Sequence, residues 1–524
     1  MLSRRDLTIL LLSLARKTNA QQLPRPDRMG VTNTGPYDYG VMGPPATPAI
    51  VAAADRAVKT PMPAGPFLPT WDSLEKNYRV PGWFDDAKFG IFMHWGIFSV
   101  AAHHNEWYEK HMYAADAAWH AEHFGPHEKS GYKDLIPKFT AAKWDPDLWA
   151  DLFRDTGARL VVGMAQHHDN FALWNSRVTP FNAVAMGPHR DLVGDLASAV
   201  RRRGLKFGLS NHGVENFTFV NPSPDIRQRL EQAKADLYDP VWAAFYNVAD
   251  RSDAAMTRFL TDWVNRNLEL IDLYQPDVLW FDNGVNLRLL DPLKLHVGAF
   301  YYNRARQWNK EVSIVAKFNA LAPSNEDTKQ TGAIVDFEKV GPRSPAGVRP
   351  GPWMVDDPIA GNSWGYIEGL RVSTASSIIA KLVDTASKGG FYLLNISPMA
   401  DGTIPEDQRK VLREIGAWLA AYGEAIYGTR PWTSFSESSS TSYHFTRRGD
   451  MLYAIASDRP AGDTVIASLG SIRTAATVRR VSLLGSSGSL DFAQEETGLR
   501  IKVGEHRDSA ANYGCVFRIE CTAG

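Results

Sequence analysis

Asp277-Val-Leu-Trp-Phe-Asp282, followed at once by Asn283-Gly284, shows the pattern that decides the fold of this 524-residue chain. A short run rich in Val, Leu, Trp and Phe that ends at a glycine turn predicts a buried strand. A carboxylate at the end of such a strand is costly unless it faces a polar site, because an unpaired buried charge is strongly disfavoured. The alternative is that Asp282 caps the next helical segment, since Asp is a preferred N-cap residue. The run alone leaves both interpretations open.

Six further runs of this kind alternate with amphipathic helical segments. The expected strands are 88–94, 159–166, 206–210, 312–317, 333–338 and 391–396, and the expected helices are 145–157, 192–203, 256–271, 373–388 and 407–423. Repeated strand–helix units imply a parallel sheet, and a length of about 350 residues favours a closed (β/α)8-like barrel. An open doubly wound sheet is the competitor, but no expected strand is followed by a glycine-rich phosphate-binding pattern. We therefore expect an α/β fold whose catalytic barrel spans residues 79–431.

The N-terminal residues have a different composition. Arg4-Arg5 precede an apolar run from Leu7 to Ala15, and Ala20 closes a stretch of small residues. This layout predicts an export signal over residues 1–20, similar to a twin-arginine signal and too short to span a bilayer; the alternative is a frayed N-terminus with chance arginines. Residues 21–78 are rich in proline and show little periodicity, so we expect an extended N-terminal lead-in rather than a domain.

Residues 432–524 have the pattern of a small all-β domain. A Ser/Thr cluster at 434–442 precedes short alternating runs separated by turn signals, which predicts a β-sandwich. Cys515 and Cys521 fall in one expected strand, where roughly 20 Å would separate them. A disulfide needs a Cα separation of about 4.4–6.8 Å, so we expect both thiols to be free.

Charge composition excludes some classes of partner. Lys plus Arg number 57 and Asp plus Glu number 58, for a formal net charge of −1. Without a basic excess we expect no nucleic-acid partner and no binding to an anionic membrane surface. No other segment approaches the length of a membrane span, and composition leaves the oligomeric state open.

Ionisable or polar residues gather at the ends of the expected strands. In order they are His94, His167-His168-Asp169, Ser210-Asn211-His212, Asp282, Lys317 and Glu338. Each alone has a structural explanation, but a barrel places all of these ends around one site, so together they predict a polar pocket. Hydrolysis of a glycosidic bond needs one carboxylate at the reacting carbon and another to protonate the leaving oxygen. Asp282 is placed for the first role and Glu338 for the second.

A metal centre is the rival interpretation of the histidines. His167 and His168 are adjacent, and neighbours on a strand point to opposite faces, so they cannot readily share one ion. We therefore expect no metal and no other cofactor.

Eight motifs, in order, resemble those of the α-L-fucosidases of glycoside hydrolase family 29. They are 89–96 (FGIFMHWG), 106–108 (EWY), 166–174 (QHHDNFALW), 279–282 (LWFD), 362–366 (NSWGY), 387–398 (SKGGFYLLNISP), 401–405 (DGTIP) and 423–432 (GEAIYGTRPW). The resemblance covers the chain from about Trp83 to Trp432. It implies an enzyme that removes terminal α-L-fucose from fucosylated oligosaccharides or glycoconjugates with retention of configuration, through a covalent fucosyl-enzyme intermediate and without a metal.

The resemblance also implies roles for individual residues. Asp282 matches the family nucleophile. The expected sugar contacts are His94, Glu106, Trp107, His167, His168, His212, Trp280 and Trp364. Histidine and glutamate suit the sugar hydroxyls, and an aromatic wall can cover the C5 methyl group.

Two departures from the family pattern leave residues open. Many members have a tyrosine after the third strand, where this chain has Ser210-Asn211-His212, so any of these three is a candidate for the sugar contact. The position of the acid/base varies in the family. Glu338 resembles the glutamate of an Asp-Phe-Glu-Arg form in which Lys339 replaces the arginine, and Glu326 is the second candidate.

Two alternatives to an α-L-fucosidase are a retaining hydrolase of a related sugar, such as an L-galactoside, and a catalytically idle fucose-binding protein. L-Galactose differs from fucose by one hydroxyl at C6, and a single added hydroxyl in an apolar pocket discriminates by only about 10–200-fold. Turnover of an aryl α-L-fucoside separates the enzyme from the binding protein, and side-by-side assays of aryl glycosides separate the sugars.

The signal pattern leads to a prediction about export. We expect the exported chain to begin near Gln21, and we expect replacement of Arg4 and Arg5 by lysine to block export, because the twin-arginine route requires the arginine pair. Cell fractionation and N-terminal mass spectrometry measure both. Unchanged export of the lysine variant would indicate the general secretory route, and an intact Met1 on exported protein would contradict cleavage.

Overall fold

The computed structural model describes residues 44–323, 330–342, 344–438, 441–460, 462–474, 476–504 and 513–522. The expected export signal at 1–20 and the second acid/base candidate, Glu326, lie outside these residues.

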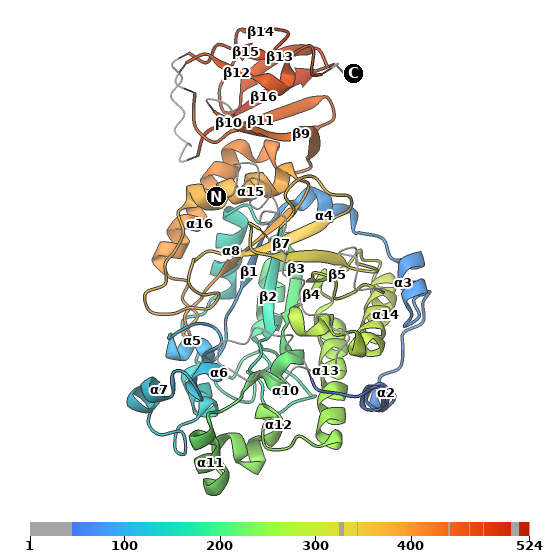
Figure 1. Cartoon of the computed structure of the whole chain (residues 1–524), viewed down its shortest axis with the longest axis vertical. Coiled ribbons are helices and arrows are strands. Elements are labelled where there is room, and N and C mark those ends of the chain that lie inside the picture. The colour runs from blue at the N-terminus through green and yellow to red at the C-terminus, as the bar shows by residue number, and fades with distance from the viewer. Residues whose placement is uncertain are drawn as a thin grey trace, which may run out of the picture.

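Eight parallel strands close into a barrel in chain order (Figure 1). They are β1 (Phe89–Met93), β2 (Leu160–Gln166), β3 (Lys206–Asn211), β4 (Val278–Phe281), β5 (Ser313–Lys317), β6 (Ile334–Glu338), β7 (Trp353–Pro358) and β8 (Phe391–Ile396). Seven coincide with expected strands to within one residue at each end. The barrel confirms the expected (β/α)8-like fold.

Strand β7 has no counterpart among the expected strands. It pairs in parallel with β6 and β8 and so completes the barrel. The acidic residues Asp356 and Asp357 interrupt the apolar run by which a buried strand is predicted from the sequence. Both are buried in the fold, where Asp356 pairs with Lys317 and Asp357 with Lys381.

Alternate strand residues form a separate apolar cluster that we assign to the barrel interior. It includes Val278 and Trp280 of β4, Val315 of β5 and Ile334 of β6, whereas Leu279 packs in the main cluster outside. Side chains along a strand alternate between its two faces. Asp282 lies two residues after Trp280, and Lys317 lies two residues after Val315, so both belong to the same inward-facing set of positions. The period of the strands therefore directs these polar side chains to the mouth of the barrel.

Helices surround the barrel. The longer ones are α8 (Pro146–Asp155), α9 (Leu192–Arg202), α13 (Asp253–Tyr274), α14 (Asp291–Gln307), α15 (Ala375–Ser387) and α16 (Glu406–Tyr422). Helix α8 begins as expected, with Pro146 at its first position. The Asp145 side chain accepts hydrogen bonds from the backbone N–H groups of Asp147 and Leu148 at 2.9 and 3.1 Å.

Shorter helices lie in the long loops that follow β1 and β3, on the carboxyl side of the barrel. They are α5 (Phe98–Ala101), α6 (Tyr108–Met112), α7 (Ala117–Phe124), α10 (Asn216–Phe219), α11 (Pro224–Ala233) and α12 (Ala243–Tyr246), whereas α4 (Gly82–Ala87) precedes β1. The loops with α7 and α11 lie at the end of the molecule opposite the C-terminal domain (Figure 1). Such βα-loops carry the active site of barrel enzymes.

The expectation of an extended lead-in before residue 78 is wrong for its described part. Residues 48–57 form helix α2 (Pro48–Ala57), which packs on α13 and α14, and α3 (Trp71–Asn77) follows. Ile50, Val51 and Ala54 are buried on one face of α2. Asn303 of α14 holds the connecting segment through two hydrogen bonds to the backbone of Phe67, at 3.0 and 2.9 Å. Tertiary packing, rather than a long periodic pattern, stabilises these short helices.

The C-terminal residues form two antiparallel sheets, as expected for a small β-sandwich. One contains β9 (Arg430–Ser438), β10 (Ser442–Arg448), β11 (Met451–Ala456), β16 (Cys515–Cys521) and β13 (Val478–Leu483); the other contains β12 (Thr464–Ile466), β15 (Leu499–Ile501) and β14 (Phe492–Gln494). The Ser/Thr cluster expected to precede the strands belongs largely to β9. Both cysteines lie in β16 and neither forms a disulfide, which confirms the expectation.

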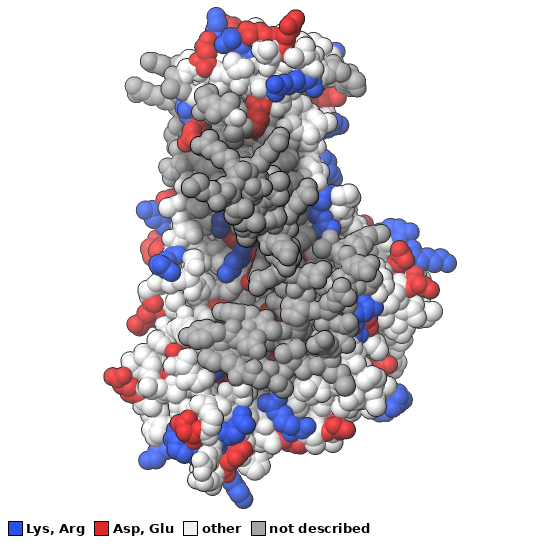
Figure 2. All heavy atoms as spheres, viewed as in Figure 1, with Lys and Arg blue, Asp and Glu red and all other residues white. Residues whose placement is uncertain are grey.

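The described surface carries mixed charge. In Figure 2 Lys and Arg are interspersed with Asp and Glu over the visible described residues, in keeping with the net charge of −1. Among the described residues, no helix is both long and apolar enough to cross a membrane.

Two buried helical glycines lead to opposite predictions. In Gly416→Ala of α16 the new methyl group would overlap the Asp155 carbonyl oxygen, whereas in Gly298→Ala of α14 it would meet Leu74 and Ile314 at ordinary distances of 3.5 and 3.6 Å. We expect Gly416→Ala to destabilise the protein by about 1–3 kcal/mol. Gly298→Ala should stabilise it by about 0.5–1 kcal/mol, because alanine loses less backbone entropy in a helix. Urea unfolding measures both, and a stable Gly416→Ala variant would contradict the close packing of α16 on α8.

Candidate active site

A cavity of about 510 Å³ opens at the carboxyl ends of the barrel strands. Ten of the residues that the sequence indicated for the site line it: His94, Glu106, Trp107, His167, His168, His212, Trp280, Asp282, Glu338 and Trp364. These residues come from the carboxyl ends of five strands and from two loops. The closed barrel therefore brings together residues up to 270 positions apart, from His94 to Trp364.

Asp282 turns its carboxylate into the cavity. It occupies the N-cap position of the 3-10 helix η5 (Asn283–Asn286), yet its side chain makes no capping hydrogen bond within the described structure. Oδ2 instead accepts a hydrogen bond from His212 Nδ1 at 3.1 Å and lies 3.7 Å from His168 Nε2. Burial opposes ionisation, but the His212 hydrogen bond and the Lys317 charge hold the pKa of Asp282 well below its ordinary value. The geometry therefore excludes the capping interpretation.

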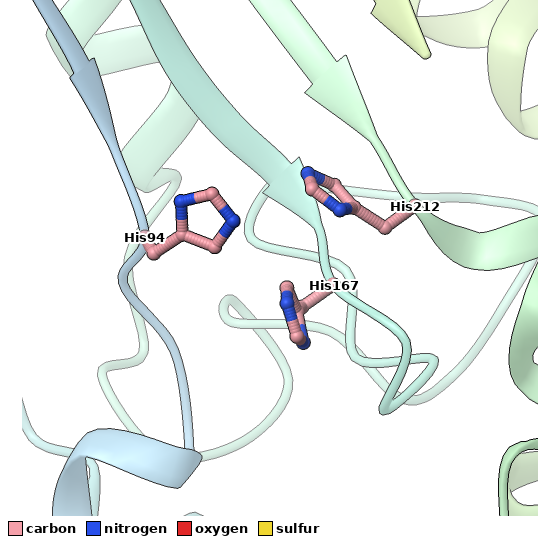
Figure 3. Close-up of side chains that lie close together, drawn as sticks. All are labelled: His94, His167 and His212. Carbon is pink, nitrogen blue, oxygen red and sulfur yellow. The ribbon is translucent and has the colours of Figure 1, made fainter. Parts of the chain in front are cut away.

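Three of the histidine rings that line the cavity lie close together (Figure 3). The ring centroids of His94 and His212 lie 5.2 Å apart, those of His94 and His167 5.6 Å, and those of His167 and His212 5.0 Å. Burial lowers the pKa of His94 and His167 well below the ordinary value, and the neighbouring histidines lower it further. Both imidazoles are therefore neutral at physiological pH.

The protonated nitrogen of His94 follows from its neighbour. The Asn395 side chain donates from Nδ2 to the Trp364 carbonyl at 2.8 Å, which turns its Oδ1 toward His94 Nδ1 at 2.7 Å. Because an amide oxygen only accepts, His94 Nδ1 carries the proton and Nε2 keeps a lone pair. His94 therefore offers an acceptor nitrogen to a ligand.

His167 and His168 both face the cavity, so the expectation that they point apart is wrong. Their ring centroids are 4.4 Å apart. Strand β2 ends at Gln166, and the alternation of a strand does not extend to the two residues that follow. Burial, followed by the neighbouring His212, lowers the pKa of His168 to about 3.

Among the residues that the structure describes, two sets of side chains have donor atoms close enough to hold a metal ion. They are His94, His167 and His212, and His168, His212 and Asp282, and the donors of each set lie within 4.8 Å of one another. Imidazole and carboxylate groups are zinc ligands, so the donor types fit such an ion. Neutral imidazoles equally suit hydroxyl groups, which both donate and accept. Independence of metal stays a prediction.

Of the three candidates Ser210, Asn211 and His212, at the end of β3 and directly after it, only His212 lines the cavity. The Ser210 hydroxyl contacts Met164 and the Gly163 carbonyl, and Asn211 bonds to Asn267 and to the Gly213 N–H. The alternation along β3 turns Asn211 away from the barrel interior.

A network of buried ion pairs surrounds Lys317, which also lines the cavity. Lys317 Nζ lies 2.5 Å from Asp356 Oδ1 and 3.4 Å from Asp336 Oδ2, and Asp336 also accepts from Trp280 Nε1 at 3.1 Å. Burial disfavours the lysine charge, but Asp356 and Asp336 outweigh it and raise the pKa of Lys317. Burial raises the pKa of both carboxyls. The lysine stays charged between Trp280 and Trp364, whose ring centroids lie 5.2 and 5.8 Å from Nζ.

Glu338 is the last residue of β6 and lines the same cavity. The next residue, Lys339, has a φ of +63°, a left-handed conformation that is strained for a residue other than glycine. The Lys339 N–H donates to the Asp356 carbonyl at 2.8 Å, which holds this turn. The chain therefore leaves the sheet abruptly after Glu338, and the Glu338 side chain remains at the mouth.

Glu106 connects two loops of the wall. Its Oε2 accepts hydrogen bonds from Ser363 Oγ at 3.2 Å and from the Trp364 N–H at 3.0 Å. Burial raises the pKa of Glu106. Glu106 therefore positions Trp364, whose ring packs against His94 at a centroid distance of 5.2 Å.

Sequence reasoning did not assign roles to Asp336, Asp356 or Glu215, and it named Lys317 only as a strand end. Asp356 could have been found from the sequence by counting strands. A barrel of this kind needs eight strands, only seven were expected, and the missing one falls between Glu338 and the helix at 373–388. No comparable signal marks Glu215, which lies in a loop and is fully buried beside this site.

Comparison with known proteins finds related sequences and structures. The sequence model of the family described as Alpha-L-fucosidase matches residues 56–424. Tissue alpha-L-fucosidase of Homo sapiens is 30% identical over 497 residues, which cover 92% of this chain and 98% of that protein. The crystal structure of Thermotoga maritima alpha-fucosidase in complex with fucose has 32% identity and a TM-score of 0.67, with coverage of 86% of this chain and all of that one. Another structure of the Thermotoga maritima enzyme contains a mechanism-based inhibitor, at 31% identity and a TM-score of 0.67 over 87% of this chain and all of that one.

The low pKa values of the site histidines lead to a prediction about pH. An ordinary histidine, with a pKa near 6.5, would gain charge as the pH falls from about 8 to 6. His94, His167 and His168 should remain neutral throughout that range, because burial keeps their pKa values below it. We therefore expect the inhibition constant of free fucose to be constant across it. A constant that rises several-fold toward pH 6 would contradict the neutral cluster.

Proposed function

The chain belongs to the alpha-L-fucosidase family, and we propose that Asp282 and Glu338 perform its reaction, the retaining hydrolysis of α-L-fucosyl linkages. The observation that carries this assignment is the state of Asp282. Its carboxylate is charged, faces the cavity and is held by His212 rather than used as a helix cap. These are the properties of a carboxylate nucleophile.

In the first step, Asp282 attacks the anomeric carbon of the fucosyl group. Because Oδ2 is hydrogen-bonded to His212, we assign the attack to Oδ1. A bond forms between this oxygen and C1 while the bond from C1 to the glycosidic oxygen breaks. Glu338 donates its proton to the departing oxygen, so the leaving group departs as an alcohol. The products are a fucosyl ester of Asp282 and an ionised Glu338.

In the second step, water replaces the ester. Glu338 now accepts a proton from the water as the water oxygen attacks C1, and the bond from C1 to Asp282 breaks. Fucose leaves, Asp282 regains its negative charge and Glu338 regains its proton. Two successive inversions at C1 give net retention. Glu338 gives one proton to the leaving group and takes one from water, so the two steps balance without a metal or a cofactor.

The neutral histidines and the tryptophans provide sugar recognition. His94 offers a lone pair at Nε2, and His167 and His168 add neutral ring nitrogens, so together they can accept from and donate to hydroxyl groups. Trp107, Trp280 and Trp364 provide the aromatic walls. We propose that these side chains contact the three hydroxyls and the apolar face of fucose.

Lys317 stabilises the charge of the nucleophile before attack. Its ammonium group helps to lower the pKa of Asp282, and the tryptophans on either side limit its contact with water. We propose that the Asp336–Asp356 pair keeps Lys317 in place, because an unpaired buried lysine would lose its charge.

The nucleophile assignment is tested by Asp282→Gly. We expect a loss of several orders of magnitude in kcat, because the covalent route disappears, with a folded protein by circular dichroism. Azide should restore part of the activity by occupying the space of the missing carboxylate. A mechanism-based fucosyl inhibitor should label Asp282 in the native enzyme, and a label on any other residue, located by peptide mass spectrometry, would refute the assignment.

The acid/base assignment is tested by Glu338→Ala with two leaving groups. An aryl fucoside with an activated nitrophenol departs with little protonation, whereas a fucosyl disaccharide needs a proton donor. We expect Glu338→Ala to impair the disaccharide far more than the nitrophenyl fucoside and to remove the alkaline limb of the pH profile. Glu326→Ala is the matched comparison. If that variant shows the dependence on the leaving group and Glu338→Ala does not, Glu326 has the role.

A further inference from the structure

Glu215 follows β3 and contacts residues at the ends of the two flanking strands, β2 and β4. The mechanism proposed for Asp282 and Glu338 does not use it. It is the last residue of the 3-10 helix η2 (Gly213–Glu215), directly after β3 and His212. Its side chain is fully buried. One carboxyl oxygen reaches the turn after β4 and the other reaches His168 after β2.

The first contact is a helix cap supplied from outside the helix. Glu215 Oε1 accepts a hydrogen bond from the backbone N–H of Gly284 at 2.6 Å. Gly284 is the second residue of η5, and Asp282 occupies its N-cap position. An aspartate at an N-cap normally accepts a hydrogen bond from the second or third N–H of its own helix. Glu215 satisfies the Gly284 donor that the Asp282 side chain would otherwise be expected to bind.

The second contact reaches the nucleophile through a histidine. Glu215 Oε2 lies 3.4 Å from His168 Nδ1, which is also 3.2 Å from the His212 carbonyl oxygen. On the other side of the ring, His168 Nε2 lies 3.7 Å from Asp282 Oδ2. The carboxyl group of Glu215 therefore packs behind the ring that faces the nucleophile. Burial raises the pKa of Glu215 well above its ordinary value, and the Asp282 charge raises it further.

We propose that Glu215 is a positioning residue that caps η5 in place of Asp282 and so leaves the Asp282 carboxylate free to face the substrate. This inference rests on the proposed role of Asp282 as the nucleophile. Without Glu215, the buried Gly284 N–H would lack a partner, and an unsatisfied buried donor is costly. Asp282 has the extended backbone of an N-cap residue, with φ −80° and ψ −172°, so rotation of its side chain could supply the missing acceptor. The nucleophile would then turn away from C1.

Two substitutions of similar size distinguish the loss of the hydrogen-bond acceptor for Gly284 from a change in side-chain volume. Glu215→Leu removes the acceptor at similar size, whereas Glu215→Gln keeps a carbonyl oxygen for the Gly284 N–H. A displacement of about 1 Å at the reacting atoms can cost about 10²-fold, so we expect a loss of that order in kcat for Glu215→Leu. Glu215→Gln should retain most of kcat and raise KM, because its NH₂ group now faces His168. The rate at which a mechanism-based inhibitor labels Asp282 should follow kcat.

The decisive measurement repeats Glu215→Leu in the Asp282→Gly variant with azide. Azide then replaces the side chain whose direction Glu215 controls, so Glu215→Leu should reduce the azide-dependent rate far less than it reduces the native rate. An equal loss in both backgrounds would show a general structural effect and overturn the inference, as would full native activity in Glu215→Leu. If Glu215→Leu does not fold, Glu215→Asp, whose carboxyl is one methylene short of Gly284, serves in the same comparison.

The outcomes distinguish this inference from the function on which it rests. An active Asp282→Gly variant that needs no azide would remove Asp282 as the nucleophile, and the inference would fall with it. An inactive variant that azide restores, together with equal losses on Glu215→Leu in both backgrounds, would remove only the role of Glu215.

Discussion

A carboxylate that must stay charged in a partly buried place, Asp282, is the constraint on which the rest of the site depends. Its desolvation is opposed by side chains from three other strand ends: the His212 hydrogen bond, the Lys317 charge and the nearby His168 ring. Lys317 in turn needs Asp336 and Asp356 to remain charged. Support for one anion therefore extends from β2 to β7, which is possible only because a closed barrel places all of these strand ends around the same axis.

The histidines around this anion are polar without being charged. Burial and mutual proximity keep His94, His167 and His168 neutral, and a like charge on any one would make a charge on the next more costly. A shell of protonated imidazoles would bind Asp282 as ion pairs and block it. A neutral shell leaves the Asp282 carboxylate accessible and offers ring nitrogens to hydroxyl groups. The same electrostatics therefore suit both the nucleophile that we propose and a polyhydroxylated substrate.

The walls of the cavity are held by hydrogen bonds between loops as well as by the sheet. Glu106 fixes the loop of Trp364, and Asn395 links that loop to His94. The strained turn at Lys339 ends β6 immediately after Glu338. Loops that carry reactive groups are ordinarily mobile, so these contacts restrict side chains that the barrel alone would not orient.

The sequence by itself determined seven of the eight barrel strands and most of the candidate site. Apolar runs such as 277–282 mark strands wherever burial selects Val, Leu, Trp and Phe, and the residue that follows each run lies at the mouth because parallel strands share a carboxyl end. Strand β7 was missed because Asp356 and Asp357 interrupt its apolar pattern, and their ion-pair partners are distant in the sequence. The helix α2 was missed because packing on α13 and α14, rather than its own periodicity, stabilises it.

Only the tertiary structure decided which groups each polar residue contacts. The sequence left Asp282 open between a strand-end carboxylate and a helix cap, and the answer depends on Glu215, 67 residues away, which satisfies the N–H that Asp282 would cap. The sequence likewise led to the prediction that His167 and His168 point to opposite faces. That prediction assumed the alternation of a strand, but β2 ends at Gln166, one residue before His167, and the two rings lie close together. Periodicity is a local property that a sequence displays directly, whereas the hydrogen-bond partner and the charge of a buried group depend on which distant side chains the fold brings next to it.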